Sequence, residues 1–83
     1  MARGAVGMPK YPGNDPAKSP GPDYQWRGTG VPGSKQGNWY NPKTGEWMHP
    51  DLGHASPIGP HWDYRAPDGK EYRLYPDGSY QLK

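Results

Sequence analysis

Apolar and polar residues alternate along the last third of the chain, which is typical of β-strands. Two Pro-Asp-Gly turns, at 67–69 and 76–78, interrupt the alternation, and each suits a type I turn closed by a glycine bulge. Counting outward from the first turn places Tyr64 opposite Tyr72, and counting from the second places Tyr72 opposite Leu82. Because both turns, assigned separately, give the same apolar face, the pattern predicts a three-stranded antiparallel meander.

The two faces of this meander differ in their chemistry, because neighbouring side chains in a strand point to opposite faces. The predicted apolar face holds Trp62, Tyr64, Tyr72, Leu74, Tyr80 and Leu82. The predicted polar face holds His61, Asp63, Arg65, Glu71, Arg73, Tyr75 and Gln81. A slip of one residue would mix the two sets, so we expect a well-specified register.

A shorter hairpin is predicted before the meander. The turn Asn-Pro-Lys-Thr-Gly at 41–45 pairs Tyr40 with Trp47 and Trp39 with Met48, and we expect this hairpin to cover the aromatic face of the meander. Residues 49–60 are rich in proline and glycine. We therefore expect them to form a long loop that carries two of the three histidines.

The N-terminal part lacks a periodic apolar pattern and is rich in proline, which is typical of an extended linker. We predict that residues 1–23 form a junction to another part of a protein and that residues 24–83 form the folded domain. Within 24–37 we expect Trp26 to pack on the core and the remainder to form a loop.

Composition limits the possible folds. The 83 residues include 13 Gly and 12 Pro, a level typical of disorder, but also 4 Trp and 7 Tyr, which disordered chains rarely contain. The absence of cysteine excludes disulfides and Cys-ligated zinc. No apolar run approaches the length of a membrane helix. The prediction is a mostly β fold, made of a small antiparallel hairpin and a three-stranded meander, with an irregular Pro/Gly-rich N-terminal segment and a long His-containing loop.

Charge adds a weak preference for polyanionic partners. The net charge is +2, with +3 in residues 1–37 and −1 in residues 38–83. The aromatic part is thus mixed in sign, as a site with charge pairs would be.

Histidine is the residue type that points to chemistry. His49, His54 and His61 lie within 13 residues, and His61 begins the polar face. Transesterification of RNA needs a base for the 2′-OH, an acid for the leaving 5′-oxygen and a cation for the phosphate, and it needs no metal or other cofactor. Imidazole suits both proton transfers, and arginine suits the phosphate.

We therefore predict a metal-independent ribonuclease without a cofactor. His61 and His54 would be its acid and base, Asp63 would orient or assist them, and Arg73 with Lys70 would bind phosphate. The candidate catalytic residues are His49, His54, His61, Asp63, Glu71 and Arg73.

Three other interpretations remain open. The polar face can be a solvated surface in which Asp63 pairs with Arg73 and Arg65 with Glu71. The three histidines can bind zinc with an open fourth position, as in a metal-dependent nuclease that cuts DNA, although their spacing fits no known ligand pattern. The run from Trp39 to Pro50 is also similar to part of a WW domain, a non-enzymatic module that binds proline-rich ligands.

The residues resemble a known family of toxin domains. The resemblance covers about residues 20–83 and is most specific at Pro-Ile-Gly-Pro-His-Trp-Asp-Tyr, residues 57–64. Its other parts are Trp-Tyr-Asn-Pro-Lys-Thr-Gly-Glu at 39–46, His-Pro-Asp-Leu-Gly-His at 49–54 and Pro-Asp-Gly at 76–78. These runs look like the polymorphic toxin type 37 domain.

This resemblance implies a mostly β, RNase-type toxin at the C-terminus of a large exported bacterial protein of the Rhs or contact-dependent type. It implies delivery into the cytoplasm of a target cell and a cognate immunity protein. The active-site residues it implies are His49, Asp51, His54, His61 and Asp63. The residues expected to bind the substrate are Asp51, Arg65, Lys70 and Tyr75. A looser, architectural similarity to the ribosome-cleaving colicins places His61, Asp63, Glu71 and Arg73 in comparable roles.

Overall fold

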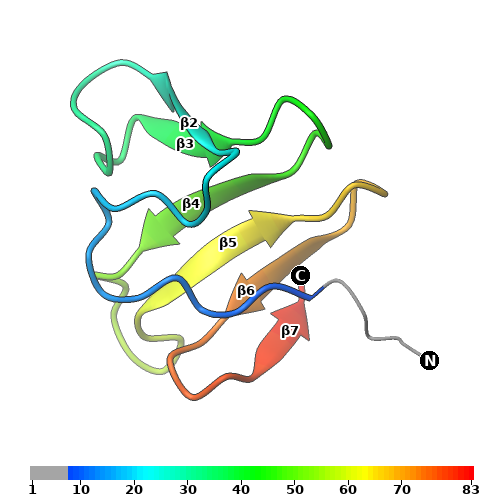
Figure 1. Ribbon diagram of the computed structural model, residues 1–83. Coiled ribbons are helices and arrows are strands. Elements are labelled where there is room, and N and C mark those ends of the chain that lie inside the picture. Colours follow the sequence, from blue (N-terminus) through cyan, green and yellow to red (C-terminus); the bar gives the residue numbers. More distant parts are fainter. Residues whose placement is uncertain (1–7) are drawn as a thin grey trace.

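The chain forms one antiparallel sheet whose strands follow each other in sequence order (Figure 1). The structure, a computed structural model, describes residues 8–83. The strands are β2 (Gln25–Gly28), β3 (Gly37–Tyr40), β4 (Trp47–Asp51), β5 (His61–Arg65), β6 (Glu71–Leu74) and β7 (Tyr80–Leu82). No helix occurs in the described part of the chain, so the expected mostly β fold is confirmed.

The C-terminal meander has the predicted register. Tyr64 lies opposite Tyr72 across β5 and β6, and Tyr72 lies opposite Leu82 across β6 and β7. Each turn ends in a glycine with φ of 90°, at Gly69 and Gly78, a conformation that other residues rarely adopt. The turn chemistry therefore sets the pairing, as the sequence predicts.

The first hairpin also has the predicted pairing, with Tyr40 opposite Trp47. The expectation that it covers the aromatic face of the meander is wrong, because β4 pairs directly with β5 and extends the same sheet. The physical reason is that β5 would otherwise leave a row of backbone groups unpaired on that side. The predicted loop at 49–60 is correspondingly too long, since β4 continues to Asp51 and the connection begins at Leu52.

The expectation of a loop around Trp26 is also wrong in part. Trp26 does pack against the core, but Gln25–Gly28 form β2, which pairs with β3. A Cβ added at Gly37 would lie 2.4 Å from the Arg27 carbonyl oxygen and 2.8 Å from the Trp26 ring. Glycine, which suggested a loop, thus allows two strands to approach closely.

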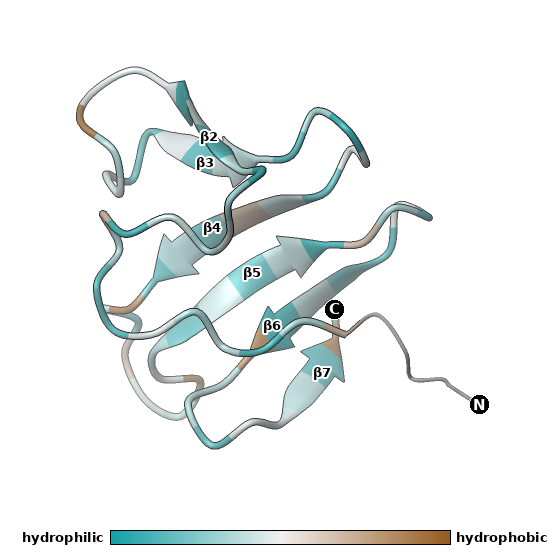
Figure 2. Cartoon of the chain, in the orientation of Figure 1, coloured by the Kyte–Doolittle hydropathy of each residue, from teal (hydrophilic) through white to brown (hydrophobic). Residues whose placement is uncertain are grey.

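The core is small and largely aromatic. Its buried residues are Trp39, Met48, Trp62, Tyr64 and Leu74. Figure 2 shows few strongly hydrophobic positions on the strands, because tryptophan and tyrosine have intermediate hydropathy on that scale. The far end of the predicted apolar face is less buried, since Tyr80 is 50% and Leu82 58% exposed.

The N-terminal segment covers this core. In Figure 1 the blue segment crosses the sheet over β5 and β6, and Met8, Tyr11 and Tyr24 pack against the buried cluster. The indole N–H of Trp62 donates to the Gly13 carbonyl at 2.9 Å, and that of Trp39 donates to the Pro16 carbonyl at 3.1 Å. From Met8 onward, the segment expected to be a linker therefore makes specific contacts with the sheet. The division into a junction at 1–23 and a domain at 24–83 stays a prediction.

Candidate functional site

The candidate site lies on the polar face of the sheet, where β4 joins the meander. Pairing of β4 with β5 places Asp51 opposite His61 and His49 opposite Asp63. Residues opposite each other in a pair share a face. The paired strands thus bring together two segments that the sequence interpretation treated as a loop and a strand.

His61 is the centre of this arrangement and is only 2% exposed. Its Nδ1 lies 2.9 Å from the Gly59 carbonyl oxygen, two residues earlier in the connection from β4. Its Nε2 lies 3.3 Å from Oδ1 of Asp63 and 3.6 Å from Oδ2 of Asp51. We call these three residues the Asp51–His61–Asp63 cluster.

The hydrogen-bonding groups of this cluster require a positive charge between His61 Nε2 and the two carboxylates. A carbonyl oxygen only accepts, so the Gly59 contact requires the proton on Nδ1. In the neutral imidazole, Nε2 would then direct a lone pair at two carboxylates, which also only accept. A positive centre between them, either a second proton on Nε2 or a cation, makes the contacts favourable.

Asp63 also contacts a lysine that the sequence interpretation missed. Its Oδ1 is buried without a hydrogen bond, and Nζ of Lys83 lies 3.4 Å from it. The same ammonium lies 3.8 Å from Oε1 of Glu71, and the Lys83 amide donates to the Glu71 carbonyl at 2.9 Å. The predicted register already implied this position, because Tyr72 opposite Leu82 puts Glu71 opposite Lys83.

Two aromatic rings lie beside His61. The ring of His54 is 5.5 Å from it and that of Tyr75 is 6.1 Å from it, centroid to centroid. His54 is exposed, and its Nδ1 lies 3.0 Å from the carbonyl oxygen of Ala55. Its Nε2 can therefore meet a substrate, whereas His61 is reached only through its neighbours.

His49 is oriented differently. It shares a row with Asp63, but its Nδ1 lies 2.7 Å from the Gly37 carbonyl oxygen on the side of β3. The group of ligand atoms that converge, all within 4.8 Å of one another, comes from Asp51, His61 and Asp63 and does not include it. The geometry thus favours a mixed His–Asp–Asp donor set over the three-histidine set considered from the sequence.

The predicted basic residues are spread along the sheet. Arg73 lies opposite Asp63 and Arg65 opposite Glu71, as expected, but within residues 8–83 neither pair is close enough to form an ion pair. Lys83 contacts both carboxylates instead. Lys70 lies in the β5–β6 turn, where its amide donates to Asp68, at the opposite end of β5 from His61.

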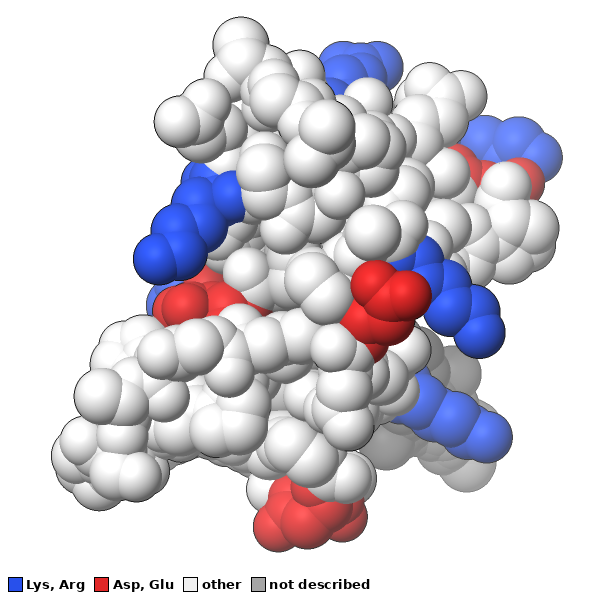
Figure 3. All heavy atoms as spheres, turned by 90° about the vertical axis from the view of Figure 1, so that its left-hand side faces the viewer, with Lys and Arg blue, Asp and Glu red and all other residues white. Residues whose placement is uncertain are grey.

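The surface charge near the site is mixed. Figure 3 views the molecule from the side on which the β4–β5 connection lies, and acidic and basic side chains are interspersed there with uncharged surface. Binding of a phosphate would therefore depend on individual cations more than on a broad basic field.

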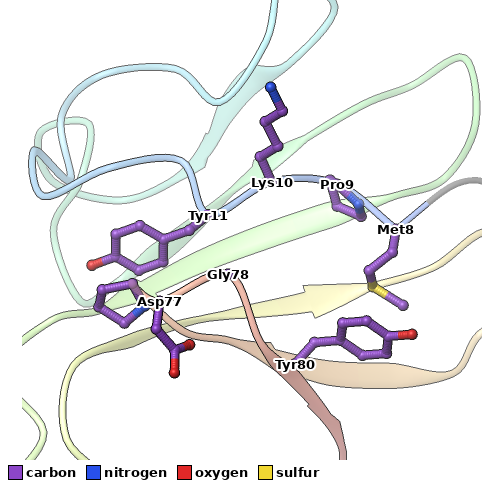
Figure 4. Close-up of a pocket in the computed structure, with 8 residues that line it drawn as sticks. Met8, Pro9, Lys10, Tyr11, Asp77, Gly78 and Tyr80 are labelled. Carbon is purple, nitrogen blue, oxygen red and sulfur yellow. The ribbon is translucent and has the colours of Figure 1, made fainter.

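A separate pocket lies away from the histidines. It has a volume of about 570 Å³ between the N-terminal segment and the β6–β7 turn, where the Met8 side chain points toward the Tyr80 ring (Figure 4). It contains none of the predicted site residues. No part of the described chain forms a helix long and apolar enough to span a membrane.

Comparison with known proteins identifies the family. The family model described as Bacterial toxin 37 matches residues 7–78, which include all three histidines and the Asp51–His61–Asp63 cluster. Neither the curated proteins nor the solved structures gave a match. The matched range also includes the N-terminal segment that covers the core. This chain, matched over most of its length, belongs to the Bacterial toxin 37 family and is a bacterial toxin domain.

Proposed function

We propose that the domain is a metal-independent endoribonuclease that cleaves RNA by transesterification. The observation that carries the proposal is the buried His61 between two carboxylates, with the exposed His54 ring 5.5 Å from it. Two imidazoles side by side, one facing solvent and one buried in contact with acids, suit an exchange of protons at neutral pH.

In the proposed reaction, Nε2 of His54 takes the proton of a ribose 2′-OH. The 2′-oxygen attacks the adjacent phosphorus, and the bond from phosphorus to the 5′-oxygen breaks. The leaving 5′-oxygen takes the proton held by His61 between Asp51 and Asp63. Since Asp51 has 34% of its side chain exposed, it is the member of the cluster through which that proton reaches the substrate. The products are a 2′,3′-cyclic phosphate and a 5′-hydroxyl.

Cations near the cluster support the same chemistry. Arg73 lies on the polar face opposite Asp63, and the Lys83 ammonium lies 3.4 Å from the same carboxylate. Either cation can stabilise the extra negative charge on the phosphorane, and the guanidinium can bind two oxygens at once. His49 and Glu71 stay predicted catalytic residues, and Arg65, Lys70 and Tyr75 stay predicted substrate-binding residues.

The wider setting follows from the family. A bacterial toxin domain implies a carrier protein and an immunity partner in general. We propose delivery at the C-terminus of a larger exported protein of the Rhs or contact-dependent type, action on RNA in the cytoplasm of the target cell, and a cognate immunity protein that blocks the site.

The decisive experiment incubates the purified 83-residue chain with total RNA in EDTA. We expect cleavage in EDTA and fragments that end in a 2′,3′-cyclic phosphate. RNA that survives EDTA, with plasmid DNA cut after magnesium or zinc is added, would instead support a metal-dependent nuclease. No cleavage of either nucleic acid would favour a non-enzymatic binding module.

A further inference from the structure

We propose that Asp51, His61 and Asp63 also form a binding site for a divalent transition-metal ion of the Zn²⁺ type. The ion would occupy the position of the proton on His61 Nε2, so that metal and proton compete for one place. The proposed site does not require the domain to be a ribonuclease. The consequence that zinc inhibits RNA cleavage rests on the proposed function.

The distances between the donors fit a tetrahedral ion. With bonds of about 2.1 Å, two ligands of a tetrahedral zinc lie about 3.4 Å apart. Nε2 of His61 is 3.3 Å from the Asp63 oxygen and 3.6 Å from the Asp51 oxygen, and all three donors lie within 4.8 Å of one another. An octahedral ion such as Mg²⁺, with bonds near 2.1 Å, would need adjacent ligands only about 3.0 Å apart. Two of the three donor separations are thus near the tetrahedral value, and the imidazole donor favours zinc over Mg²⁺, which prefers oxygen ligands.

A second observation, on the histidine itself, points to a ligand between these groups. His61 is 2% exposed, and donation from its Nδ1–H to the Gly59 carbonyl leaves Nε2 as the free donor atom of the neutral ring. A backbone carbonyl is one of the usual partners of the distal nitrogen of a metal-bound histidine, where it sets the tautomer and the ring orientation. Opposite Nε2, Oδ1 of Asp63 is buried and makes no hydrogen bond.

Lys83 is the natural competitor for this site. Its ammonium lies 3.4 Å from the Asp63 oxygen that would bind the ion, and its side chain is 32% exposed. A bound dication would repel it, and the flexible lysine can turn toward Glu71 or solvent. Removing the lysine should therefore strengthen metal binding, whereas removing a true ligand should weaken it.

Titration calorimetry of the metal-free chain with ZnCl₂ tests the site. We expect one ion per chain, and intense visible absorption from tetrahedral cobalt when Co²⁺ replaces zinc. Asp51→Asn should weaken affinity by at least about tenfold, and Lys83→Ala should strengthen it by roughly two- to fivefold. His49→Ala is the matched control, because its imidazole lies outside the converging donors, and it should bind as the wild type does.

Three outcomes would overturn the site. These are no binding by the folded wild-type chain, binding that Asp51→Asn and His61→Gln leave unchanged, or loss of binding in His49→Ala. Near-UV circular dichroism verifies the fold of each variant, and Asp51→Asn alters a partly exposed residue in case His61→Gln does not fold.

The inhibitory consequence is measured separately, as RNA cleavage in EDTA against cleavage with excess zinc. We expect loss of cleavage with zinc and its recovery on chelation. Binding with unchanged cleavage would overturn the inhibition alone. No cleavage under any condition would overturn the inhibition together with the proposed function, while the titration still decides the site.

Discussion

Nε2 of His61 lies 3.3 Å from Oδ1 of Asp63, an oxygen that is buried and makes no hydrogen bond. The two residues are two positions apart on β5, so both side chains point to the polar face. Asp51 joins them from β4, and the Lys83 ammonium approaches the same Asp63 oxygen from the end of β7. These contacts bring hydrogen-bond acceptors together, so a proton or a cation bound between them makes the contacts favourable.

The first prediction concerns the two imidazoles. His54→Ala and His61→Ala should each reduce the rate of RNA cleavage in EDTA by about 10²- to 10⁴-fold, since each removes one proton transfer. Gel-based cleavage of a labelled RNA measures this, with Lys35→Ala, an exposed loop residue, as the control. Cleavage at the wild-type rate by folded His61→Ala would remove His61 from the reaction.

The second prediction concerns the unequal contributions of the Trp62 and Trp26 indole N–H groups to stability. Trp62→Phe removes the hydrogen bond to the Gly13 carbonyl and leaves that oxygen unpaired, whereas Nε1 of Trp26 is buried and has no partner to lose. Trp62→Phe should therefore lower the free energy of unfolding by at least about 1 kcal/mol more than Trp26→Phe. Urea denaturation followed by circular dichroism measures the difference. Equal losses would mean that the contact with Gly13 does not stabilise the fold.

The third prediction concerns the N-terminal segment. Deleting residues 1–23 removes the hydrogen-bond acceptors of the Trp39 and Trp62 indoles and uncovers the core, so the melting temperature should fall by at least about 10 °C. A chain that starts at Met8 keeps every contact described for this segment and is the control. A shortened chain as stable as this control would show that residues 24–83 are sufficient for the fold.

The fourth prediction concerns alkaline pH. Burial and the nearby Glu46 carboxylate raise the pKa of Tyr24 to about 12, and burial together with the hydrogen bond to Glu46 also raises the pKa of Tyr64. A raised pKa in the folded state stabilises the fold below the unfolded value of about 10 and loses that contribution as the pH rises through the folded value. The free energy of unfolding should thus begin to fall above about pH 10.

Denaturation by urea between pH 8 and pH 11.5 measures this loss, and Tyr64→Phe provides the comparison. Because phenylalanine does not titrate, the variant should lose less stability over this interval than the wild type does. An equal loss in the two proteins would show that Tyr64 does not contribute to the alkaline transition.

Much of the sheet could be predicted because its determinants are local. A Pro-Asp-Gly turn specifies its own geometry, and once it is placed, alternation carries the register along both strands to Leu82. The same counting predicts Glu71 opposite Lys83, although the sequence contains no signal that makes Lys83 a site residue. Strand pairing alone does not predict ion pairs. Arg73 lies directly opposite Asp63, but the cation that contacts this carboxylate is Lys83.

The contacts between distant segments could not be predicted in this way. No local sequence pattern predicts that β4 pairs with β5 across the connection from Leu52 to Pro60. Pro50 even disfavours a strand at that position, because proline cannot donate a backbone hydrogen bond. The spacing of residues also does not predict that the Gly13 carbonyl accepts a hydrogen bond from the Trp62 indole, 49 residues later, or that the Pro16 carbonyl accepts one from the Trp39 indole, 23 residues later.

By itself the sequence determined the β character of the chain, its turns, the register of the meander and the presence of histidines among acids. The pairing of β4 with β5 then placed Asp51 against His61, and the packing of residues 8–24 against the sheet covered the core. The physical reason is that turn geometry and side-chain alternation act between near neighbours. The pairing of open strand edges and the burial of large rings depend on the whole chain being folded at once.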